Sequence, residues 1–205
     1  MTLAARRAGL DRLHRRMRRC RRCLDLGCLI VPPAIFTGGI GARVMIVGQA
    51  PGSSEVEADR PFNAQSGTRL FQWLAQAGFD ETEFRARQYM TSVTKCFPGK
   101  AALGGGDRRP TTVEIEACRP YLDEQLSLID PALVVPVGKL AIDVFFPDHP
   151  SLEEIIGTRH VLDGRVVIPL PHPSGASRWH QTPANRDRIA RAIRLLAQHR
   201  IRLGL

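Results

Sequence analysis

Short apolar runs rich in β-branched residues alternate with amphipathic stretches along this chain of 205 residues. Strands are expected at 43–47, 89–94, 133–137 and 166–170. Helices are expected at 3–19, from Ser66 to 77, from Thr111 (N-cap of a capping box with Glu114), after Gly138 and at 183–202. This alternation predicts an α/β fold with three α/β/α layers and a central, mostly parallel four-stranded sheet.

Two short motifs directly follow predicted strands. G-Q-A-P-G begins at Gly48, and P-H-P-S-G begins at Pro171. In open parallel sheets the ligand crevice lies outside the carboxyl ends of the strands, so we expect both motifs to border one crevice.

The net charge of +9 is concentrated at the N-terminus, where residues 1–22 hold nine arginines and one aspartate. Such a charge favours a polyanionic partner. We expect a basic helix with its arginines near a nucleic-acid backbone. A basic tail or a transit-peptide-like leader is the alternative.

Five cysteines without a secretory segment favour a reducing, cytoplasmic location and metal ligation over disulfides. No apolar run is long enough to cross a bilayer, so a membrane partner is not expected. Nothing in the sequence demands more than a monomer.

Four stretches, taken in order, resemble the uracil-DNA glycosylase superfamily, most closely its iron–sulfur family 4. They are C-R-R-C at Cys20, G-Q-A-P-G with D-R-P-F-N-A-Q-S-G-T-R-L behind it, T-K-C-F-P-G followed by E-A-C-R-P-Y-L, and P-H-P-S-G. The resemblance implies one uracil-DNA glycosylase-like domain over 1–205, with the basic helix of 1–23 tied to the body through cysteines. It also implies base-excision repair of uracil, in single- or double-stranded DNA, by hydrolysis of the N-glycosidic bond.

By the same resemblance, a [4Fe–4S] cluster has Cys20, Cys23, Cys96 and Cys118 as ligands. Four thiolates also suit zinc, which remains the alternative. Cys28 is left over as a buried thiol or a competing ligand.

The resemblance also assigns the pocket. Phe62 stacks on the flipped base, Gly48 and Ala50 border it, and His172 donates a hydrogen bond to the uracil carbonyl. Ser66, Gly67 and Ser174 are expected to contact the DNA backbone. Arg178 and Trp179 are expected to fill the space that the flipped base leaves.

This sequence departs from the family at two places. Gln49 and Ala50 leave the first motif without a carboxylate, so Gln49 is expected to position water rather than act as a base, with Glu55 or Asp59 in support. Ser92 stands where the family has an asparagine that reads the uracil edge, which puts strict uracil selectivity in question.

No lysine adjoins the His172 motif, which favours a monofunctional hydrolase over a Schiff-base lyase. Two alternatives stay open: a damage-binding protein with weak or no catalysis, and a metal-stabilised nucleic-acid binder without a base pocket.

Overall fold

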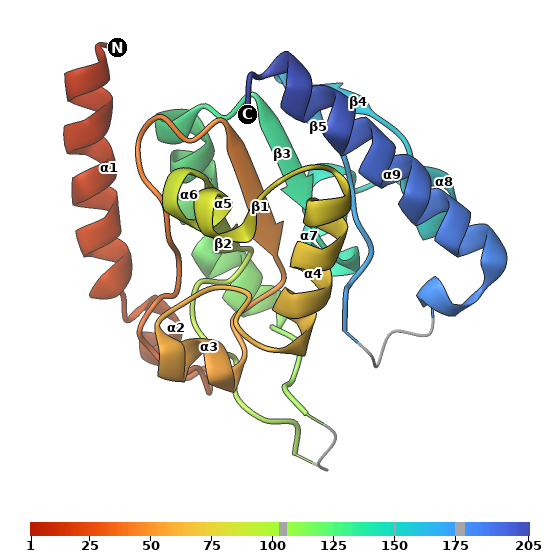
Figure 1. The fold of residues 1–205 in the computed structure, drawn as a ribbon. Coiled ribbons are helices and arrows are strands. Elements are labelled where there is room, and N and C mark those ends of the chain that lie inside the picture. The colour runs from red at the N-terminus through yellow and green to blue at the C-terminus, as the bar shows by residue number, and fades with distance from the viewer. Residues whose placement is uncertain (103–105, 150, 175–178) are drawn as a thin grey trace.

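The computed structural model describes residues 1–102, 106–149, 151–174 and 179–205. A twisted sheet forms the centre, with helices on both faces (Figure 1). The strands are β1 (Val44–Gly48), β2 (Tyr89–Ser92), β3 (Leu133–Pro136), β4 (His160–Leu162) and β5 (Arg165–Val167). Their order is β2-β1-β3-β5-β4; β1 runs parallel to β2 and β3, β3 runs parallel to β5, and β4 is antiparallel to β5. The prediction of an α/β fold with a mostly parallel sheet is confirmed.

The expected number of four strands is wrong, because β4 forms a fifth strand at the edge of the sheet. Its three residues are exposed or half-buried, so they show no buried apolar run that would have marked a strand. The last predicted strand is also shorter than expected: β5 ends at Val167, and Leu170 makes only an isolated bridge to Val137.

The helices largely follow the sequence pattern. The long ones are α1 (Leu3–Arg18), α4 (Gln65–Gln76), α6 (Thr112–Ile129) and α9 (Pro183–Arg202). The shorter ones are α2 (Arg22–Asp25), α3 (Ser53–Ala58), α5 (Glu81–Arg87), α7 (Lys139–Phe145), α8 (Leu152–Ile155) and the 3-10 turn η1 (Trp179–Gln181). Thr111 caps α6 in the predicted capping box with Glu114. A further helix, α3, begins directly after the first motif, where the sequence pattern predicts none.

Alternate residues of the strands face two apolar layers. Val44 and Ile46 of β1 pack with buried residues of α4, α5 and α9, whereas Met45 and Val47 pack with α1 and α6. On α1 the buried face consists of Gly9, Leu10, Leu13 and Met17, and its other face is basic. The helix is therefore packed on the body rather than forming a free tail. No helix among the described residues has the length and apolarity needed to span a bilayer.

Candidate active site

One cavity lies at the carboxyl ends of β1 and β2 and takes in both strand-end motifs. Gly48, Gln49, Ala50 and Pro51 line it from the first motif, and His172 and Pro173 line it from the second. Ser92, Phe62, Ser66 and Glu55, which the sequence analysis also named, line it as well. The structure therefore brings His172 and Phe62 to one cavity, as the sequence predicts.

The hydrogen bonds of His172 define which ring nitrogen is a donor. The backbone N–H of Ser174 donates to Nδ1 of His172 at 3.2 Å, and the Ser174 hydroxyl lies 2.9 Å from the same atom. Since Nδ1 is an acceptor, the neutral imidazole carries its hydrogen on Nε2. Burial, aided by the nearby charge of Arg109, lowers the pKa of His172 below its usual 6.5. At neutral pH the ring is therefore an uncharged Nε2–H donor.

Two glycines make room for this arrangement. A Cβ on Gly138, where φ is +87°, would lie 3.0 Å from the His172 ring. A Cβ on Gly48 would lie 2.9 Å from the Phe62 ring. The phenyl ring therefore rests directly on the backbone at the end of β1, where a side chain would displace it.

Phe62 adopts a left-handed backbone conformation, with φ of +53°, which a residue of this size rarely takes without support. Its N–H donates to the carboxylate of Glu55, and its carbonyl accepts from Arg85 at 2.7 Å. The other carboxylate oxygen of Glu55 accepts the N–H of Gly52. The ring position is thus set by contacts from α3 and α5.

Glu55 also lines the cavity. Burial raises the pKa of its carboxyl group, although hydrogen bonds from the backbone of Gly52, Phe62 and Asn63 oppose the shift. Asp59, the other acid considered from sequence, instead pairs with Arg18 at 2.5 Å at the end of α3. The cavity therefore does contain a carboxylate, even though the first motif has none.

The hydroxyl of Ser92 has its hydrogen already engaged. It donates to the carbonyl of Thr94 at 2.7 Å, within the buried end of β2. The oxygen retains acceptor capacity, so Ser92 can receive one hydrogen bond from a base edge. It cannot offer the paired donor and acceptor of an amide. Thr91 lines the same cavity and was not singled out from sequence.

The residues predicted to contact DNA have different surroundings. Ser66 lines the cavity, whereas Gly67 packs so tightly that an added Cβ would lie 1.9 Å from the Phe62 carbonyl oxygen. Trp179 donates its indole N–H to Glu153 at 2.6 Å and packs against the apolar layer of α9. Arg178 lies outside the described residues. Their contacts with DNA stay predictions.

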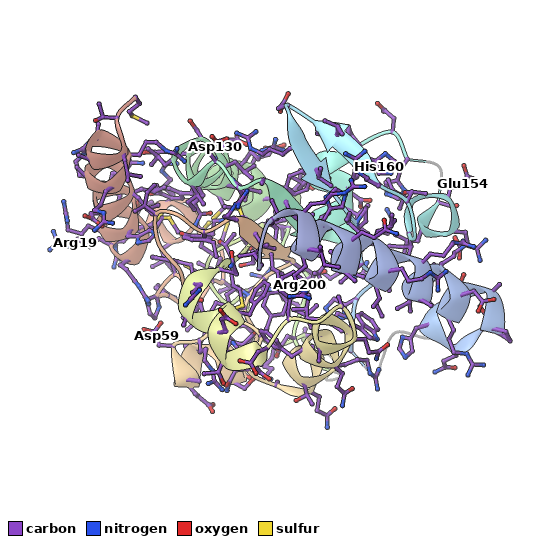
Figure 2. All side chains as sticks on the ribbon, turned by 45° about the horizontal axis from the view of Figure 1, so that its top comes forward. Arg19, Asp59, Asp130, Glu154, His160 and Arg200 are labelled. Carbon is purple, nitrogen blue, oxygen red and sulfur yellow. The ribbon has the colours of Figure 1, made fainter. Side chains whose placement is uncertain are left out.

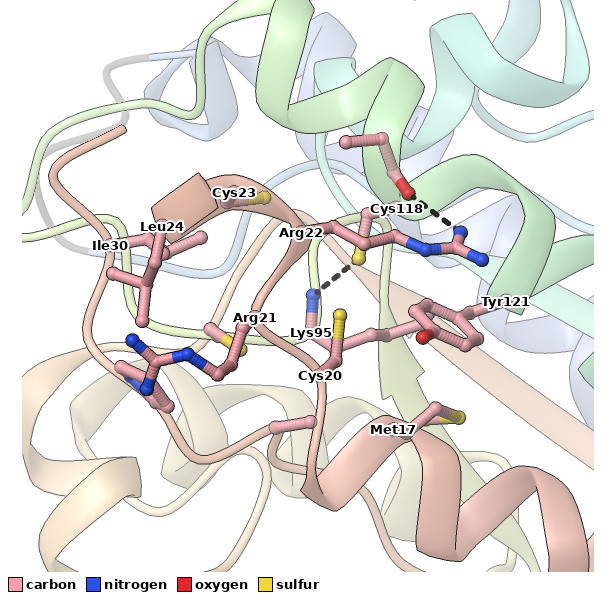
Figure 3. Close-up of a pocket in the computed structure, with 14 residues that line it drawn as sticks. Met17, Cys20, Arg21, Arg22, Cys23, Leu24, Ile30, Lys95, Cys118 and Tyr121 are labelled. Carbon is pink, nitrogen blue, oxygen red and sulfur yellow. Dashed lines mark hydrogen bonds between the residues drawn. The ribbon is translucent and has the colours of Figure 1, made fainter. Parts of the chain in front are cut away.

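The four predicted cysteine ligands line a second cavity, at the meeting point of α1, α2 and α6 (Figure 3). Cys20 and Cys23 flank the start of α2, Cys96 follows β2, and Cys118 lies on α6. Cys28 does not line this cavity. Segments far apart in sequence thus bring these four thiols to one place.

The thiols are close enough to affect one another. Burial first, and then the neighbouring thiols Cys118, Cys28 and Cys20, raise the pKa of Cys23 to about 12. Burial first, and then the thiols of Cys118, Cys20 and Cys23, raise the pKa of Cys96 to about 12. A bound metal centre would supply the positive charge that such thiolates need. In the described part of the chain, no three His, Cys, Asp or Glu side chains are already arranged as a metal site. The donor set nevertheless fits a thiolate-ligated group.

Lys95 lines the cavity of the cysteines and does not line the strand-end cavity. It is fully buried, its ammonium donates to the carbonyl of Ser92, and burial lowers its pKa to about 8. Lys139 pairs with Asp143 at 2.9 Å, and Lys100 pairs with Asp107 at 2.7 Å. Among the described residues, no lysine lines the cavity at the carboxyl ends of β1 and β2.

A mostly parallel α/β sheet with a histidine donor, a phenyl ring and a carboxylate around one strand-end cavity is the arrangement of α/β enzymes that bind their ligands outside the carboxyl ends of the strands. The particular family follows from comparison with known proteins. Residues 36–197 match the model of the uracil DNA glycosylase superfamily, and the chain belongs to that family.

Three relatives named type-4 uracil-DNA glycosylase are similar to this chain. The protein from Pyrobaculum aerophilum is 32% identical over 150 residues, covering 73% of this chain and 67% of the relative. That from Sulfurisphaera tokodaii is 31% identical and covers 66% of this chain and 61% of the relative. That from Thermotoga maritima is 30% identical and covers 78% of each.

Proposed function

We propose that this chain is a monofunctional uracil-DNA glycosylase that removes a flipped uracil from DNA by hydrolysis. The observation that carries the proposal is the convergence of Phe62, Ser92, Gln49 and the neutral Nε2–H donor of His172 on one cavity. The type-4 names of the relatives support uracil as the base. The proposed enzyme is monomeric, intracellular and a single domain over 1–205.

The reaction follows from these groups. The target nucleotide leaves the stack and its base enters the cavity, where Phe62 stacks on it. As the C1′–N1 bond breaks, negative charge develops on the uracil oxygen, and the Nε2–H of His172 donates to it. A neutral donor suits this role because it stabilises the anion without a full proton transfer.

The sugar becomes an oxocarbenium-like electrophile, which a positioned water attacks at C1′. The amide of Gln49 holds the water, and the nearby carboxylate of Glu55 stabilises the positive sugar. The new C1′–O bond forms, the water loses a proton to solvent, and the departing uracil anion gains one. The products are free uracil and an abasic site.

The four cysteines would hold a [4Fe–4S] cluster, with zinc as the alternative. The cluster would cross-link α1 and α2 to α6 and take no part in bond cleavage. Metal and sulfide analysis of anaerobically purified protein, beside Cys96→Ser and Cys118→Ser variants, separates the two. Iron and sulfide in the wild type, lost in the variants, support the cluster; zinc alone contradicts it.

Excision from oligonucleotides tests the function. Uracil, hypoxanthine and undamaged bases are placed at one position in single- and double-stranded DNA, with folded, metal-loaded protein. Release of uracil supports the proposal. Absence of any product excludes it.

A damage-binding protein without turnover is the second candidate, motivated by Gln49 and Ala50 in the first motif. It predicts uracil-dependent binding in a gel-shift assay and no product from the same DNA. The carboxylate of Glu55 in the cavity favours the enzyme.

A further inference from the structure

An exposed groove lies between the C-terminal half of α1, the helix α2 and Tyr121 of α6. Its walls carry six arginines: Arg12, Arg15, Arg16, Arg19, Arg21 and Arg22. We call it the arginine groove. Its only acidic lining residue among those described is Asp25.

Most of these guanidinium groups have no acidic partner. Arg16 pairs with Glu124, and Arg22 lies over the ring of Tyr121, 4.7 Å from its centroid, and donates weakly to a carbonyl of α6. The other four make no ion pair within the described chain. The groove therefore keeps a surplus of positive charge facing solvent.

Compensation of the cysteine centre does not account for this surplus. Lys95, which lines the cysteine cavity, already supplies a buried positive charge beside Cys118 and Cys96. Arg15 and Arg19, by contrast, are exposed and do not line that cavity. Figure 2 shows Arg19 projecting away from the body at the outer edge of α1.

The arginine groove lies beside the element that borders the base cavity. Arg18, at the end of α1, pairs with Asp59, the C-cap of α3, and α3 also carries Glu55 of the cavity. In Figure 1 the lower end of α1, α2 and α3 lie at the edge toward which the arrow of β1 points. DNA seated over the cavity would continue over α3 toward the arginine groove.

We propose that the arginine groove binds the phosphodiester backbone of DNA flanking the flipped nucleotide on one side. This inference rests on the proposed function. Guanidinium groups at helical spacing on one face, from Arg12 to Arg19, suit a row of phosphates, which arginine binds in a bidentate manner. The groove then supplies sequence-independent affinity, while the cavity supplies base recognition.

The test compares two double variants that each remove two exposed positive charges. Arg15→Gln with Arg19→Gln alters the groove. Arg7→Gln with Arg202→Gln alters the N-terminal half of α1 and the last residue of α9, whose chain ends Figure 1 marks. Binding to uracil-containing DNA is measured over a range of salt concentrations. Each lost phosphate contact lowers the slope of log K against log salt by about 0.7–0.9, so the groove variant should lose about 1.4–1.8 and the control nothing.

A second arm localises the contact. Oligonucleotides are shortened on the 5′ or the 3′ side of the uracil, and the affinity deficit of the groove variant should vanish for one of the two series only. Equal slopes of log K against log salt for the two variants overturn the proposal. An affinity deficit of the groove variant that stays the same whichever side of the oligonucleotide is shortened also overturns it. Stronger competition by poly-glutamate than by undamaged DNA would mean that the groove takes an acidic protein, which also overturns it.

Excision is measured on the same DNA at saturating enzyme. If the wild-type protein releases uracil and the two variants have equal salt slopes, only the proposal that the arginine groove binds DNA is refuted. Protein that releases no uracil but shows the groove-specific slope refutes the glycosylase proposal alone.

Discussion

One carboxylate oxygen of Glu55 accepts the backbone N–H of Phe62. The other oxygen accepts the N–H of Gly52, so one largely buried side chain ties the first motif to the stacking ring. The strained backbone at Phe62, with its positive φ, is maintained by this contact and by Arg85. The geometry of the base cavity therefore depends on a residue outside both strand-end motifs.

Glu55→Gln should loosen the Phe62 backbone, because an amide presents an NH₂ group where the carboxylate presents a second acceptor. A buried N–H without its acceptor costs about 1–3 kcal/mol, so the free energy of unfolding should fall by that amount in urea titrations. The matched control is Glu57→Gln, an exposed position on the same helix. Equal stability of the two variants would contradict the role assigned to Glu55.

Replacing Phe62 by alanine should weaken capture of the flipped base. Stacking of a base on an aromatic ring contributes about 1–3 kcal/mol, which corresponds to roughly 5- to 150-fold in kcat/KM. Because the ring packs on the backbone of Gly48, Phe62→Leu should retain more of the activity than Phe62→Ala. Single-turnover excision at several enzyme concentrations measures the effect. Unchanged kinetics for the alanine variant would remove Phe62 from the site.

His172→Ala removes the donor to the uracil oxygen. Loss of one such donor typically lowers the rate by about 10²–10³, and we expect that decrease in the single-turnover rate constant. His160→Ala, at the edge strand β4, serves as the control and should leave the rate unchanged. A decrease in both variants alike would point to misfolding, which circular dichroism checks.

The pH profile reports the protonation state of His172. Burial lowers its pKa below 6.5, so the neutral donor predominates at pH 6.5 and above and is lost as the pH falls through the lowered value. The rate constant should therefore be flat above pH 6.5 and fall on the acid side. In His172→Ala the part of this acid limb that belongs to the imidazole should disappear, which leaves only the fall caused by protonation of Glu55. A rate constant that instead falls as the pH rises through 6.5 would show that the charged ring is the active form.

Ser92→Asn should sharpen selection for uracil. The Ser92 hydroxyl donates to Thr94 and so offers the base only an acceptor, whereas an asparagine offers a donor and an acceptor together. One added hydrogen bond of discrimination, about 1–1.5 kcal/mol, raises the ratio of uracil to hypoxanthine excision by roughly tenfold. The oligonucleotide panel gives this ratio directly. A ratio that falls would mean that Ser92 does not face the base edge.

The local pattern of the chain was enough to predict the α/β layers, the capping box at Thr111 and the two strand-end motifs, because period, caps and buried runs are properties of neighbouring residues. The family resemblance supplied His172, Phe62 and the four cysteines, all of which line the expected cavities. The short strand β4 was missed, since an exposed edge strand has no apolar signature.

Only the tertiary structure decided which groups outside the motifs act on them. It placed Glu55 rather than Asp59 in the cavity, engaged the Ser92 hydroxyl with Thr94, and oriented His172 through Ser174. It also left Lys95 in the lining of the cysteine cavity and outside that of the base cavity. These outcomes depend on which backbone atoms meet after the strands have paired, and no spacing along the chain encodes such contacts.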